Sequence, residues 1–190
     1  KKKKKKKKKA PPPPPPNLHT DLTYYDYSAK DMIEYSMVEG MTGLYANNLG
    51  TIDGKGLEWR LRWRPTANLD VQANYSQVEN EDKQGHSLPG FSEKMATLSI
   101  NFKPNETINI NLFSQYFGKQ NRELNDERPP VDDYVWTSAR FGYQFSSRPI
   151  ELGLTVKNLA NAKGHYPSAS IAEDYPITGR QTTLEMSYHF

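Results

Sequence analysis

Apolar and polar side chains alternate at every second position in several stretches of the chain. The clearest stretch runs from 56 to 63, where Leu57, Trp59, Leu61 and Trp63 alternate with Gly56, Glu58, Arg60 and Arg62. Successive side chains of a β-strand point to opposite faces, so this stretch would carry two indoles on one face and three charges on the other. The pattern predicts a strand that meets an apolar medium on one side and water on the other.

The same alternation recurs, and about eight segments of this kind follow one another along the chain. The other segments are 18–27, 69–76, 96–103, 108–112, 135–145, 152–156 and 184–190. Their lengths are close to those of strands in membrane barrels, and each is separated from the next by residues typical of turns. The sequence therefore predicts an all-β fold of antiparallel strands in meander order.

The predicted connections alternate between short and long. Short, Pro-containing turns are predicted at 64–68, 104–107 and 146–149, and long polar loops at 28–50, 79–93, 118–133 and 160–178. Transmembrane β-barrels of outer membranes are built in this way, with short turns on the periplasmic side and long loops outside. The connections thus favour a transmembrane β-barrel over a soluble sandwich.

Large aromatic residues fall at one level of the predicted sheet. Those near the short turns on the apolar face are Trp63, Phe102, Phe145 and Phe190, while Tyr75 and Tyr116 lie near the long loops. Core packing would explain any one of them, but not four at the same level. Aromatic girdles mark both membrane interfaces, so the four residues predict a girdle on the periplasmic side.

The final strand ends the sequence on an aromatic residue. Its apolar positions are Leu184, Met186, Tyr188 and Phe190, and they alternate with Glu185, Ser187 and His189. This strand resembles the last strand of bacterial outer-membrane barrels, which ends in Phe after apolar residues at every second position. The resemblance implies that the four apolar residues form the signal read by the outer-membrane assembly machinery.

Composition narrows the possible functions. The formal net charge is +3, but residues 1–9 are all Lys, so 16 basic and 22 acidic residues remain and the rest of the chain carries −6. With no basic stripe after this run, we expect no nucleic-acid partner. Residues 1–16, nine Lys, one Ala and six Pro, predict a disordered low-complexity tail preceding a barrel domain at 17–190.

Candidate chemistry is sparse, and we expect no enzyme, no cofactor and no metal site. The chain has no Cys, and its four His residues show no metal-binding spacing. Ser187 and His189 lie two apart on one strand, as expected for a polar wall rather than a catalytic triad. The acidic loop residues Asp126, Glu127, Asp132 and Asp133 match no calcium motif. Charges predicted to face the barrel lumen are Glu58, Arg60, Arg62, Lys103 and Arg140.

Several short motifs then resemble one family, the TonB-dependent outer-membrane receptors. They are YSAKDMIEY at 27–35, IDGKGLEWRLRWRPT at 52–66, LPG at 88–90, VKNLAN at 156–161 followed by Tyr166, and Gly179-Arg180. The resemblance implies a barrel of 22 strands that encloses a plug and imports iron chelates, cobalamin or similar scarce ligands with energy relayed by TonB. About eight strands are present, which corresponds to the carboxy-terminal third, and no plug or TonB-contacting segment is found.

We therefore interpret the chain as the carboxy-terminal barrel segment of such a receptor, placed in the outer membrane of a Gram-negative bacterium. Expected partners are outer-membrane lipid, the assembly machinery and, in an intact receptor, the plug and TonB. Rigid scaffolds present binding residues on loops, so ligand contacts are predicted at Tyr35, Met37, Met41, Tyr45, Tyr166 and Tyr175. One alternative is a complete eight-stranded barrel with a structural or adhesin role. Another is a soluble calyx that binds a lipophile.

Overall fold

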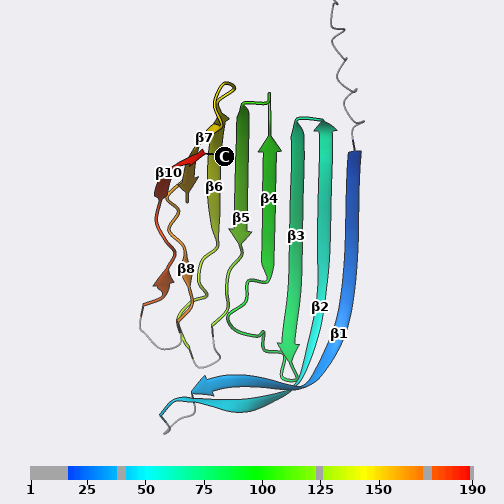
Figure 1. The fold of residues 1–190 in the computed structure, drawn as a ribbon. Helices are drawn as coiled ribbons and strands as arrows, with labels where there is room; N and C mark the ends of the chain where they lie inside the picture. The colour runs from blue at the N-terminus through cyan, green and yellow to red at the C-terminus, as the bar shows by residue number, and fades with distance from the viewer. Residues whose placement is uncertain (1–16, 38–41, 123–125, 169–172, 189–190) are drawn as a thin grey trace, which may run out of the picture.

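The computed structural model describes residues 17–37, 42–122, 126–168 and 173–188, and their regular structure is entirely β (Figure 1). The strands are β1 (Asn17–Met37), β2 (Leu44–Thr66), β3 (Leu69–Asp82), β4 (Lys94–Phe102), β5 (Ile108–Phe117), β6 (Tyr134–Gln144), β7 (Ile150–Lys157), β8 (His165–Tyr166), β9 (Tyr175–Pro176) and β10 (Gln181–Tyr188). The described part of the chain contains no helix long and apolar enough to cross a membrane.

Eight of the strands form one antiparallel sheet in the order β1-β2-β3-β4-β5-β6-β7-β10. Each strand pairs with the next, so the predicted all-β meander is confirmed. Short connections join β2 to β3, β4 to β5 and β6 to β7 at one end of the sheet, as predicted. In the β4–β5 turn, the Asn105 side chain accepts hydrogen bonds from the backbone N–H groups of Thr107 and Ile108 at 3.0 and 2.9 Å. This local bonding shapes the turn, and Asn68 of the neighbouring β2–β3 turn also contacts it, accepting from the Lys103 N–H at 2.8 Å and donating to the Pro104 carbonyl at 3.4 Å.

The predicted long loop at 28–50 is wrong. These residues continue β1 and β2 into a hairpin that pairs from Met32–Gly50 to Met37–Leu44, with register shifts next to Met32. The pairing of β2 with β3 begins only at Ile52. Beyond that level the backbone N–H and C=O groups of the hairpin pair with each other across β1 and β2. This pairing explains why a polar sequence with weak alternation still forms strands. Figure 1 shows the hairpin turning sharply at the long-loop end and running sideways below the ends of the other strands.

The sheet is open in the described residues, because β1 pairs only with β2 and β10 only with β7. β1 and β10 occupy opposite sides of the sheet in Figure 1. They also differ in length, with 21 and 8 residues. A complete eight-stranded barrel would need these two strands to pair, so the fold does not favour that alternative.

The register places the two kinds of side chain on opposite faces. Glu58 pairs with Ser76, Ser76 with Met95 and Met95 with Phe117, so these positions share one face, here called the polar face. Trp59, Tyr75 and Ala96 share the other, the apolar face. Few apolar side chains are buried among the described residues, the clearest being Ile52, Val131 and Tyr134. A single sheet layer leaves its apolar face without a protein partner.

Candidate functional site

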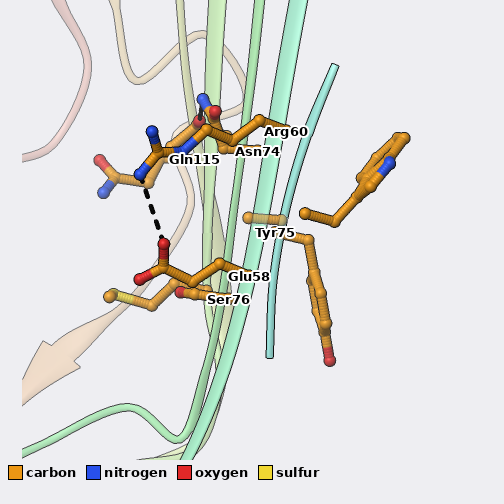
Figure 2. A pocket seen from close by; sticks show the side chains of 10 residues that line it. Glu58, Arg60, Asn74, Tyr75, Ser76 and Gln115 are labelled. Carbon is orange, nitrogen blue, oxygen red and sulfur yellow. Dashed lines mark hydrogen bonds and ion pairs between the residues drawn. The ribbon is translucent and has the colours of Figure 1, made fainter. Parts of the chain in front are cut away.

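The polar face is hollowed at the middle of β2 to β5. A cavity of about 390 Å³ is lined by Glu58, Arg60, Asn74, Ser76, Thr97 and Gln115, among others. Figure 2 shows Glu58, Arg60, Asn74 and Gln115 projecting to one side and Tyr75 to the other. The Asn74 amide donates to the Thr97 hydroxyl at 2.9 Å, and Arg60 pairs with Glu58 at 3.3 Å. Polar side chains from four adjacent strands thus line this cavity.

The predicted lumen charges mostly meet partners on this face. Arg62 and Arg64 both pair with Asp70, the Arg62 pair at 3.1 Å. Arg140 lies 2.9 Å from Glu151 and 3.9 Å from Glu185, which come from β7 and β10. Glu58, Arg60, Arg62 and Arg140 share the polar face by register. Lys103 lies in the turn after β4, where its backbone N–H donates to Asn68. That these charges face a lumen stays a prediction.

Two paired glycines explain how Arg140 can lie across the sheet. Gly142 of β6 pairs with Gly153 of β7. A Cβ atom on Gly153 would lie 2.7 Å from the Arg140 Nη2 atom, and one on Gly142 would lie 2.9 Å from Nη1. Because both positions lack side chains, the guanidinium reaches Glu151 over bare backbone.

The residues of the predicted girdle lie on the apolar face beside the short turns. Trp63, Phe102 and Phe145 are 42, 38 and 37% exposed, so they are not gathered in a closed interior as a soluble calyx would require. Leu184, Met186 and Tyr188 lie on the same face of β10 and are also exposed. Phe190 lies outside the described residues. The roles of these residues as girdle and assembly signal stay predictions.

The predicted ligand-contact residues divide between two ribbons. Tyr45 is exposed on the β1–β2 hairpin. Tyr166 and Tyr175 pair across the small β8–β9 sheet, and both are exposed. Tyr35 and Met37 belong to β1, but their side chains, like Met41, lie outside the described residues. The structure therefore brings together two of the six residues and places a third on a separate element.

Sequence reasoning missed a group of aromatic residues on the polar face. Phe117 pairs with Tyr134, and Gln115 with Trp136, so all four side chains lie on the same face as Glu58. The Phe117 and Tyr134 rings stack with centroids 4.9 Å apart. The alternation already holds the signal: Tyr134 and Trp136 are an even number of positions from Arg140, which is predicted to face the lumen, so they share its face.

An ion-pair network joins the loop before β6 to the segment between β7 and β10. This latch consists of Arg122, Asp126, Arg128 and Asp174. Arg122 donates to both oxygens of Asp174 at 2.7 and 2.6 Å, and Arg128 donates to the Ser168 carbonyl at 2.6 Å. The Arg122 guanidinium lowers the pKa of Asp174 to about 2, and hydrogen bonds from Arg128 lower the pKa of Asp126 to about 2. Bidentate pairs of this kind fix the relative position of two segments.

Comparison with known proteins places this arrangement in a family. A family model described as "TonB dependent receptor-like, beta-barrel" matches residues 14–159. The chain belongs to this family. Members are transporters of the outer membrane of Gram-negative bacteria and not enzymes. No curated protein matches the chain in a sequence search.

Solved structures of receptors share the fold of this receptor segment. It superposes on the ferric-catecholate import receptor Fiu from E. coli K12 with a TM-score of 0.72 and 19% identity, covering 91% of the segment and 25% of Fiu. It superposes on the copper transporter OprC with a TM-score of 0.72 and 19% identity, covering 91% of the segment and 29% of OprC. For the ferripyoverdine receptor of Pseudomonas aeruginosa the TM-score is 0.71 and the identity 15%, and the superposition covers 90% of the segment and 25% of that receptor. The segment thus spans between a quarter and three-tenths of the length of these receptors.

Proposed function

We propose that residues 17–190 supply strands of the barrel of an outer-membrane receptor that takes up a scarce ligand, such as an iron–siderophore complex or cobalamin. In this proposal the polar face lines the lumen and meets the plug, and the apolar face meets outer-membrane lipid. TonB would supply energy through the plug, and the assembly machinery would insert the barrel. The remaining strands of the barrel would pair with the open edges of β1 and β10.

The observation that carries the proposal is the difference between the two faces of the sheet, which is most marked over β2 to β4. Apolar rings such as Trp59 and Tyr75 project from one face, while charged and amide side chains such as Arg60 and Asn74 project from the other. In a soluble protein an exposed apolar face of this extent would need a covering layer. In an outer-membrane barrel, lipid covers it.

For the ligand we propose a general chemical class. Three of the similar receptors are named after what they import or bind: ferric catecholates for Fiu, copper for OprC and ferripyoverdine for the Pseudomonas receptor. These cargoes share scarcity and a metal ion. We propose the same general class for this segment, with first contacts at the β1–β2 hairpin and at Tyr166 and Tyr175, which are exposed at the long-loop end.

Assembly of a hybrid protein tests the proposal. In this OprC hybrid, residues 17–190 replace the stretch of OprC on which they superpose. We expect the hybrid to reach the outer membrane of a Gram-negative host and to migrate as a folded barrel on unheated gels. A matched hybrid that lacks Phe190 should assemble less efficiently. Degradation of the hybrid in the periplasm, under conditions in which OprC itself assembles, would contradict the proposal.

A further inference from the structure

A second cavity lies on the polar face, nearer the long-loop end than the first. It measures about 430 Å³, within the range of small-molecule sites. Its floor is formed by β5, β6 and β7, which contribute Phe117, Tyr134, Trp136 and Lys157. Its outer wall is the segment 176–179, which precedes β10. The segment before β10 therefore borders an open cavity on the sheet.

The lining of this cavity is richer in aromatic rings than that of the first cavity on the same face. Phe117 and Tyr134 stack at 4.9 Å, and the Tyr166 ring meets the Tyr134 ring edge-on at 6.4 Å. Gly164 makes the approach possible, because a Cβ atom at that position would lie 2.5 to 2.9 Å from the Tyr134 ring. Rings held at these distances offer flat apolar surfaces to another ring.

Two polar groups of the lining lack partners among the described residues. Tyr134 is 6% exposed, and its buried hydroxyl finds no acceptor of suitable geometry, although the Tyr166 phenol lies nearby. The exposed Lys157 forms no ion pair or side-chain hydrogen bond within the described residues. A buried hydroxyl without an acceptor is costly. An acceptor oxygen that enters beside the ring, with a shift of the exposed Tyr166, would complete the bond.

The latch holds the outer wall of the cavity in place. Asp174, which Arg122 binds with two hydrogen bonds, directly precedes β9, and β9 leads into the wall segment 176–179. The backbone N–H of Ile177 donates to the Gly164 carbonyl at 2.9 Å, which joins the wall to the residue that precedes β8. The site is thus built from fixed elements.

We propose that this cavity binds an aromatic anion, with the ring packed against Trp136 and its aromatic neighbours, the negative charge paired with Lys157 and an oxygen bonded to the Tyr134 hydroxyl. The inference rests on the proposed function for its physiological meaning, because the cavity opens to the ligand path only if the polar face lines the lumen. Binding itself does not depend on which face meets lipid.

Equilibrium dialysis of radiolabelled benzoate against the detergent-solubilised OprC hybrid tests the site, with OprC as background. We expect saturable binding to the hybrid above OprC. Cyclohexanecarboxylate, which has the charge without the aromatic ring, and benzamide, which has the ring without the charge, should compete at least about tenfold more weakly.

Two substitutions separate binding from folding. Lys157→Gln and Tyr134→Phe should each weaken benzoate binding about tenfold, and Tyr134→Phe should not lower the unfolding temperature, because it removes an unpaired hydroxyl. The controls Lys103→Gln and Tyr143→Phe, outside the cavity, should bind normally. Benzoate binding no greater than that of OprC, or unchanged in both cavity variants, would overturn the inference. Such a result would leave barrel assembly, and so the proposed function, intact.

Discussion

Glycines at particular positions of the sheet decide where large side chains lie. Tyr25 and Tyr27 of β1 project onto Gly56 and Gly54 of β2, and their rings stack with centroids 6.2 Å apart. The Tyr27 hydroxyl then reaches Asn80 at 2.8 Å. A strand glycine loses packing of its own, but here the space is filled by a tyrosine from the neighbouring strand.

The substitution Gly56→Ala should therefore destabilise the folded protein by about 1–3 kcal/mol. Its Cβ atom would contact the Tyr25 phenol and lie 2.7 Å from the Gln77 carbonyl oxygen, and the backbone oxygen cannot move away. Gly153→Ala is the comparison, because the three atoms nearest to its Cβ atom belong to the end of the Arg140 side chain and not to the backbone. Thermal unfolding of the two variants in the OprC hybrid measures the difference. Equal losses would show that the Gln77 backbone yields as easily as a side chain.

The latch predicts that the two loop segments it joins become less ordered at low pH. The pKa values of Asp126 and Asp174 fall from 3.8 to about 2 in the folded state. Their contribution to stability is therefore complete above pH 3.8 and is lost as the pH falls towards 2. Hydrogen exchange of peptides from 118–133 and 160–178, corrected for the intrinsic effect of pH, should be slow at pH 5 and faster at pH 2.5. In the Arg122→Gln variant, hydrogen exchange of these peptides should be fast at both pH 5 and pH 2.5. Equal exchange rates in the variant and the parent would contradict the role of the latch.

At the scale of elements, alternation within a strand was readable from the sequence, whereas strand ends and loop contacts were not. The faces of Leu57 to Trp63 and the short turns were predicted because period two and Pro-containing turns are local signals. The hairpin at 28–50 was mistaken for a loop because its pairing is satisfied between its own two strands. The Arg122–Asp174 pair joins residues 52 apart in sequence, and no local pattern announces such a partner.

The β1–β2 hairpin beyond Ile52 should be separable from the sheet. Above that level its strands pair only with each other. Replacing residues 33–48 with a short turn should leave assembly of the OprC hybrid unchanged, because no hydrogen bond of the sheet is lost. In a complete receptor with its ligand identified, the same deletion should lower uptake. Ligand uptake equal to that of the parent receptor would show that the hairpin is not a ligand-contact element.

At the scale of the whole molecule, the open sheet has two edges and an uncovered apolar face. Unpaired strand edges promote association between chains, and backbone groups without partners are costly in lipid as well. We therefore expect residues 17–190 expressed alone to aggregate rather than to fold as a monomer. Size-exclusion chromatography and thermal unfolding in detergent measure this. A sharp and reversible unfolding transition of a monomer would contradict it.

In the proposed receptor the apolar face of the sheet meets lipid, and two neighbouring residues on β3 can test this. Asn74 and Tyr75 lie at one depth on opposite faces, and the chain has no Cys of its own. A bimane fluorophore attached to Asn74→Cys or Tyr75→Cys, in an OprC hybrid without other cysteines, is measured in bilayers of brominated lipid. We predict strong quenching at position 75 and little at position 74. Equal quenching, or stronger quenching at position 74, would contradict the account.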